Sequence, residues 1–119
     1  MSRTHALAAL LLAALPAACA IFDDRTDYDR HRLTDLKVPR EGGDVFYYDV
    51  SISGAFPADD PKAEEARMRW LDGWLKQRGM CANGHEVVRK RPFEYMEDNP
   101  AHRDLRYEVK CKPAPEKKP

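Results

Sequence analysis

The chain has 119 residues, of which 34% are charged, and its 20 lysine and arginine residues are balanced by 20 aspartate and glutamate residues. This length allows one small domain after any leader is removed. The lack of a basic excess argues against a nucleic-acid partner.

Residues 1–18 predict a signal peptide. Arg3 and His5 precede an apolar run over residues 6–15, which is too short to span a bilayer, and the segment closes on the small residues Ala17 and Ala18. This order of a basic head, an apolar stretch and a small-residue exit is typical of export signals. We therefore expect an exported protein.

The residues that close this segment, Pro16-Ala17-Ala18-Cys19, resemble the lipobox of bacterial lipoproteins. The resemblance implies that Cys19 is lipidated, becomes the mature N-terminus and anchors the protein to a membrane. Ala20 stands where enteric lipoproteins of the inner membrane carry Asp, which implies the outer membrane, facing the periplasm. The chain departs from the family at Pro16, where Leu is usual. The alternative is ordinary cleavage after Ala20, which would give a soluble periplasmic protein.

Residues 19–43 are interpreted as the lipid anchor and a charged tether. Residues 23–32 are dense in mixed charge, and Pro39 with Gly42-Gly43 interrupts any regular structure. The alternative is a partly ordered N-terminal arm, in which Leu33, Leu36 and Val38 form a short turn that docks on the domain.

The next two elements are a strand over residues 44–53 and a helix that begins at Pro61. Phe46, Tyr48 and Val50 fall on one face of the strand. The helix is predicted to have Asp60 as its N-cap, because aspartate accepts hydrogen bonds from the free N–H groups of the first turn. Gly79 takes the left-handed C′ position at the other end.

Two further strands complete the pattern. One runs from about Glu86 to Arg91, with Pro92 indicating a sheet edge or a break. The other begins at Leu105 and alternates apolar and charged residues up to Lys112. The Pro- and Lys-rich residues 113–119 predict a disordered tail.

The order β-α-β-β over residues 44–112 predicts an α/β domain of the α+β kind, a two-layer sandwich with one helix on a three-stranded sheet. Trp70 and Trp74 lie one helical turn apart beside Leu71 and Leu75. We expect these indole rings to fill the core. Stacking on a sugar or peptidoglycan ring is the alternative.

With Cys19 lipidated or removed, Cys81 and Cys111 remain, and two thiols in an oxidising compartment predict one disulfide. Two alternatives use the same sulfurs. A metal site could combine them with His85 and His102, although the spacing matches no zinc pattern. Thiol catalysis would need a free thiolate, which a disulfide removes. We therefore expect no metal and no cofactor.

Cations on the last two strands form the predicted interaction surface. Arg89, Lys90, Arg106 and Lys110 are assigned to the outer face of the sheet, with an envelope protein or anionic lipid headgroups as the partner. Glu97, Asp98 and Glu108 are near enough in sequence to pair with them, which would leave only a solvated face.

No assembled nucleophile or acid–base set is recognisable in the sequence, so no catalytic residue is assigned. We expect a non-enzymatic cell-envelope lipoprotein that acts as a binding or accessory module. It would meet its partner through the outer sheet face or the loop over residues 96–103. The alternative is a secreted inhibitor or binder of an envelope hydrolase, with residues 96–103 as a wedge.

Overall fold

The computed structural model describes residues 27–116. The predicted signal peptide, the lipidation at Cys19 and the last residues of the predicted tail lie outside this range. Within residues 27–116, no helix is both long and apolar enough to cross a membrane.

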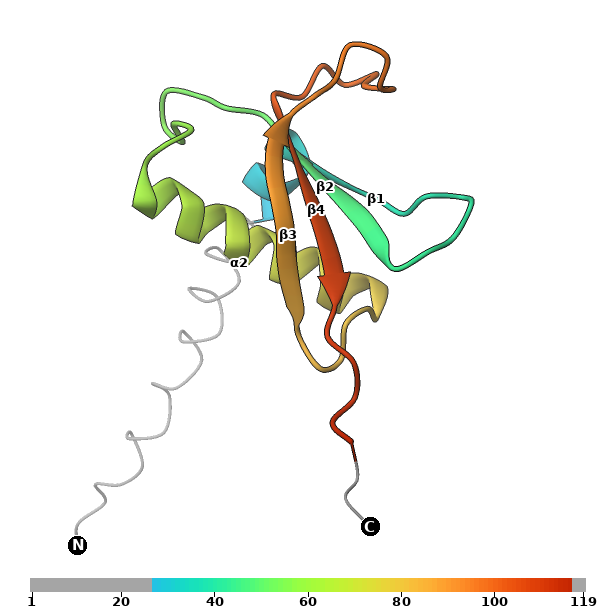
Figure 1. The fold of residues 1–119 in the computed structure, drawn as a ribbon. Helices are drawn as coiled ribbons and strands as arrows, with labels where there is room; N and C mark the ends of the chain where they lie inside the picture. Colours follow the sequence, from blue (N-terminus) through green and yellow to red (C-terminus); the bar gives the residue numbers. More distant parts are fainter. Residues whose placement is uncertain (1–26, 117–119) are drawn as a thin grey trace, which may run out of the picture.

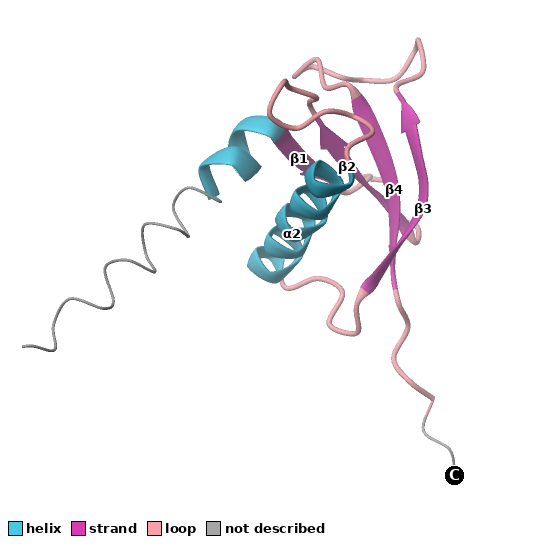
Figure 2. Cartoon of the chain, turned by 90° about the vertical axis from the view of Figure 1, so that its left-hand side faces the viewer, coloured by secondary structure: helices cyan, strands magenta, loops and turns pink. Residues whose placement is uncertain are grey.

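The domain is α+β, with one antiparallel four-stranded sheet and helix α2 on one of its faces (Figures 1 and 2). The predicted class is therefore confirmed. The elements are β1 (Thr34–Lys37), β2 (Val45–Val50), α2 (Pro61–Arg78), β3 (His85–Pro92) and β4 (Leu105–Cys111). The strands lie in the order β1-β2-β4-β3, so β3 is an edge strand, which is one of the two possibilities that Pro92 indicates.

The prediction of three strands is wrong, because β1 adds a fourth within the segment interpreted as a tether. β1 pairs with β2, and Leu36 lies opposite Tyr48. Leu33, Thr34 and Leu36 are buried, which gives this short charged segment an apolar side that packs on the core. Residues 27–33 form a helical turn before it. The ordered domain therefore includes residues well before position 44.

Helix α2 begins and ends where its capping residues predict. The carboxylate of Asp60 accepts a hydrogen bond from the backbone N–H three residues later at 2.9 Å, and Pro61 is the first helical residue. Gly79 has φ 64°, a left-handed conformation that glycine adopts without steric cost. The N–H of Met80 then donates to the carbonyl of Leu75 at 2.9 Å, which closes the helix end.

The core lies between α2 and the sheet. Trp70 and Trp74 are both buried, as predicted from their helical spacing. Tyr48 and Tyr107 pack from neighbouring strands with their ring centroids 5.5 Å apart. The main cluster of buried apolar side chains consists of Leu36, Phe46, Tyr48, Val50, Leu71, Trp74, Leu75, Tyr107 and Val109.

The helical turn of residues 27–33 docks on α2 through Arg30. The guanidinium of Arg30 lies 5.0 Å from the ring centroid of Trp74. A β-carbon at Gly73 would come within 2.5 Å of the Arg30 Nη1 atom. Gly73 therefore sits inside the helix, where glycine is otherwise unfavourable, because it leaves room for this side chain.

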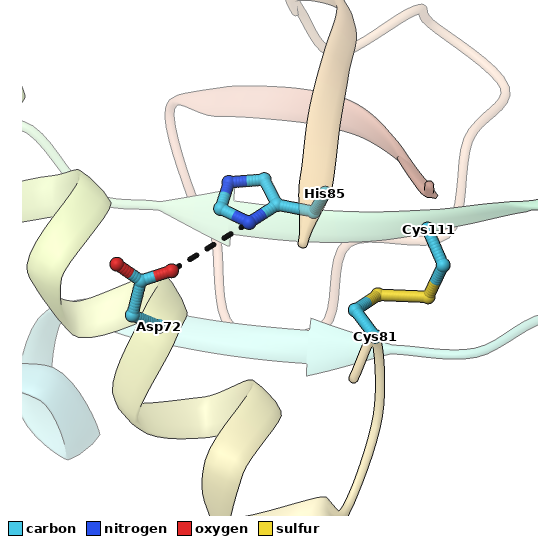
Figure 3. Close-up of a disulfide and its surroundings, with 4 residues drawn as sticks. All are labelled: Asp72, Cys81, His85 and Cys111. Carbon is cyan, nitrogen blue, oxygen red and sulfur yellow. Dashed lines mark ion pairs between the residues drawn. A yellow bond between two sulfur atoms is a disulfide. The ribbon is translucent and has the colours of Figure 1, made fainter. Parts of the chain in front are cut away.

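Cys81 and Cys111 form a disulfide, as the cysteine count predicts (Figure 3). The bond joins the chain just after α2 to the last residue of β4.

In Figure 3 the His85 ring points to Asp72, with 3.5 Å between Nδ1 and Oδ1. Within residues 27–116, no three His, Cys, Asp or Glu side chains gather as a metal site would require.

We expect reduction of this disulfide to lower the free energy of unfolding by about 3–4 kcal/mol, because the bond closes a loop of 30 residues in the unfolded chain. Urea unfolding with and without reductant measures the change. A variant with both Cys81→Ala and Cys111→Ala should have the urea midpoint of the reduced protein, and reductant should not change it. Equal midpoints for the oxidised and reduced forms would contradict the prediction.

Candidate interaction site on the β3–β4 loop

Three of the four predicted surface cations lie on the sheet face that points away from α2. Along β4, Arg106 and Lys110 alternate with the buried Tyr107 and Val109. Arg89 reaches the same face from β3, and its Nε donates to Glu108 Oε2 at 2.7 Å.

Lys90 lies on the opposite face, beside α2. A register shift between Val87 and Arg89 interrupts the two-residue alternation of β3, and Lys90 is opposite Tyr107. Its Nζ is 3.2 Å from Glu64 Oε2 on the helix. The four cations therefore do not form one surface, since this β-bulge changes the face that Lys90 occupies.

Arg106 is buried rather than exposed, because the β3–β4 loop (residues 93–104) covers it. Its side chain is 7% exposed, and that of its partner Asp49 is fully buried. The guanidinium donates to both carboxylate oxygens of Asp49, at 2.8 and 2.9 Å. It also lies between the rings of Tyr47 and Phe93, with centroids 4.3 and 4.6 Å away. The hydrogen bonds to Asp49 raise the pKa of Arg106, which keeps it charged.

Glu97 ties the β3–β4 loop to the strands beneath it. Its carboxylate accepts hydrogen bonds from Arg91 at 2.5 and 2.8 Å and from Arg106 at 2.9 Å. It also accepts from the backbone N–H of Glu94 at 2.8 Å, which closes the turn. The hydrogen bonds from Arg91 are the main reason that the pKa of Glu97 falls to about 2.

Arg103 provides a second attachment at the other end of the loop. The side chain of Asn99 donates to the Arg103 carbonyl at 2.9 Å and accepts from the Arg103 N–H at 2.8 Å. The guanidinium of Arg103 donates to Asp35 on β1 at 2.9 Å and to the Arg32 carbonyl at 2.9 Å. Both ends of the loop are therefore held by charged hydrogen bonds.

The turn that Glu97 closes with the backbone of Glu94 presents Tyr95 and Met96 to solvent. Tyr95 is 98% exposed and Met96 is 86% exposed, the two highest values among the large apolar side chains described. We call this pair the loop tip. Glu94 precedes it and Asp98 follows two residues after Met96, and neither carboxylate forms an ion pair with any residue in the described range.

The charged groups around the loop are suited to holding its shape. Glu97 and Glu108 both have lowered pKa values, chiefly because Arg91 donates hydrogen bonds to each. Carboxylates that remain ionised in this way are poor proton donors and weak bases at neutral pH. These two carboxylates are therefore suited to structural ion pairs rather than to acid–base chemistry.

Sequence reasoning named residues 96–103 as a contact loop but missed the groups that fix its shape. Asp49 gave no signal, since an aspartate that alternates with apolar residues along a strand ordinarily faces water. The outward-facing Arg106 on β4 could have indicated that Asp49 is buried, because a buried carboxylate requires a cationic partner.

In comparisons with known proteins, no family model, no curated protein and no solved structure matches this chain.

We expect Glu97 to stabilise the fold less at acid pH. Its pKa of about 2 lies below the ordinary 4.5, so its contribution is complete above about pH 4.5 and is lost as the pH falls toward 2. Urea unfolding across this range measures the loss. Glu108 contributes in the same direction, so the informative quantity is the difference from Glu97→Gln, which should lose less stability on acidification. Identical pH profiles would contradict the prediction.

Proposed function

We propose that this chain is a non-enzymatic binding module of the bacterial cell envelope, held at the outer membrane by a lipid on Cys19 and facing the periplasm. It contacts a partner protein with the loop tip, Tyr95 and Met96. The observation that carries this proposal is the near-complete exposure of two large apolar side chains on a loop held at both ends.

A loop that is already ordered in the free protein loses little conformational entropy when it binds. Side chains and loops that must become ordered on association reduce the affinity, and this cost falls when the free protein already holds the bound shape. Glu97 and Arg103 supply that order before any partner arrives. Exposed aromatic side chains such as Tyr95 are frequent centres of binding energy in protein interfaces.

The charges near the tip favour a protein partner over anionic lipid headgroups. Glu94 places a carboxylate next to Tyr95 in the chain, and Asp98 follows two residues after Met96. Three cations of the predicted surface, Arg89, Lys90 and Arg106, are held by Glu108, Glu64 and Asp49, respectively, which leaves Lys110 alone without an ion pair among the described residues. We therefore propose a protein as the partner of this loop.

The loop contact can be tested by placing a photo-reactive benzoyl-phenylalanine at position 95 of the full chain in living cells. We expect illumination to link this position to an envelope protein. Lys76 on α2 is also exposed, and the same photo-reactive residue there provides the matched control, from which no such product should form. Equal yields from both positions would remove the support for a contact at the tip.

We expect Cys19→Ser to move the protein from the detergent phase to the aqueous phase in phase partitioning. Loss of the sulfur removes the attachment point for the lipid, and the acyl chains of lipoproteins provide stable membrane attachment. A matched Ser2→Ala variant, changed within the predicted signal, should partition like the unaltered protein. If Cys19→Ser stays in the detergent phase, the proposed anchor is wrong.

A further inference from the structure

We infer that the partner of the loop tip is a second copy of this chain. The tip of one copy enters a pocket at the far end of β4 in the next copy. This inference rests on the proposed function, since it names the protein that the tip contacts.

The receiving pocket lies where the β1–β2 loop, the end of α2 and the end of β4 meet. Its volume is about 590 Å³, within the range of pockets that accept ligands. Val38, Phe46 and Met80 supply apolar lining, and Lys110 and Lys112 add two cations. An apolar pocket of this kind accepts an aromatic ring and a thioether, whose removal from water is favourable.

The charges of tip and pocket are complementary. Glu94 directly precedes the tip, and Asp98 lies two residues after Met96, where it borders a hollow also lined by Lys37 and Arg40. Lys110 and Lys112 line the receiving pocket. None of Glu94, Asp98, Lys110 and Lys112 forms an ion pair with a residue of the described chain. Asp44 also lines the pocket, which leaves it an excess of one cation. Opposite charges brought together in this way select the partner and orient it.

A single copy cannot fill its own pocket. The loop precedes Leu105 and the pocket adjoins Cys111, so the seven residues of β4 separate them by roughly 20 Å. Figure 1 shows the loop and the end of β4 at opposite ends of the sheet. The contact therefore joins unlike surfaces of two copies in a head-to-tail arrangement.

The contact is small, and the membrane compensates for this. A buried aromatic side chain covers about 150–250 Å², whereas a stable interface buries about 800 Å² on each partner. Two side chains are therefore insufficient for a stable dimer in dilute solution. Lipid anchors on one membrane raise the effective concentration of neighbouring copies, as a linker does between tethered modules. The association is expected in the envelope of intact cells.

The test uses the full chain in cells, with benzoyl-phenylalanine at position 95. We expect a covalent dimer of the chain, in which position 95 is linked to Met80 or to residues 110–113 of the other copy. Lys110→Glu with Lys112→Glu should lower the dimer yield about tenfold, because like charges then oppose each other across the contact. Adding Glu94→Lys with Asp98→Lys to the same chain should restore it.

The other outcomes separate this inference from the proposed function. Cross-linking only to a different envelope protein would overturn the inference and leave the binding module intact. A yield no higher than that of the Lys76 control would overturn both. A dimer yield that the charge reversal leaves unchanged, or a cross-link to residues outside the pocket, would show that the pocket is not the receiving site. Recovery in the charge-exchanged chain excludes misfolding as the cause of the loss.

Discussion

Asp49→Ala is expected to lower the free energy of unfolding by about 3–5 kcal/mol, because it leaves the Arg106 guanidinium buried without its main partner. A large part of the stability of a small domain would then be lost. The fully buried carboxylate accepts both of its hydrogen bonds from Arg106 in a bidentate pair. Urea unfolding monitored by circular dichroism provides the measurement.

Asp72→Ala is the matched control for Asp49→Ala. The Asp72 side chain is 58% exposed, and its removal should change the stability by no more than about 0.5 kcal/mol. Replacing Asp49 and Arg106 together with apolar residues should recover part of the loss, since no unpaired charge then remains inside. Equal destabilisation by Asp49→Ala and Asp72→Ala would show that the buried pair is not a major contributor.

Trp74→Ala is expected to lower the free energy of unfolding by about 3–5 kcal/mol, which is typical for removal of a buried large aromatic side chain. Its indole N–H also donates to Thr34 Oγ1 on β1 at 2.8 Å. The ring further supports the guanidinium of Arg30. The substitution should therefore loosen residues 27–37 as well as weaken the core, and amide hydrogen exchange of this segment reports on that effect.

Trp74→Phe separates the two contributions. It retains most of the buried ring but removes the hydrogen-bond donor to Thr34, so a loss of about 1 kcal/mol is expected from the missing bond, with a further small loss from the reduced volume. Residues 27–37 should exchange only slightly faster than in the unaltered protein. If Trp74→Ala leaves their exchange unchanged, Trp74 does not hold β1 in place.

The elements that local patterns predict well are those in which several signals agree. α2 combines an apolar stripe with Asp60 and Pro61 at one end and Gly79 at the other, and the structure confirms each of these positions. β2 and β4 each place every second residue on the core face, while Asp49 and Arg106 on the opposite face are also buried. Their pairing in the sheet also agrees with the predicted sandwich.

The features that sequence reasoning missed depend on contacts between distant residues. β1 has only four residues, and Leu36 is the single large apolar residue among them, so the surrounding charged residues obscure the alternating pattern of a strand. Asp49 and Arg106 are each ordinary surface residues until the sheet places them opposite one another. The β-bulge in β3 has no local signature, because no glycine marks it, and it alone moves Lys90 to the face of α2.

The strand order β1-β2-β4-β3 has a consequence for the time at which the domain can fold. β4 is the last strand of the described chain to be synthesised, yet it lies between β2 and β3. The buried pair of Asp49 and Arg106 spans 57 residues of sequence. Until β4 has emerged from the ribosome, β2 and β3 have no common neighbour, so a nascent chain cannot complete the four-stranded sheet. The proposed export of the chain in an extended form would therefore not require a finished fold to be undone.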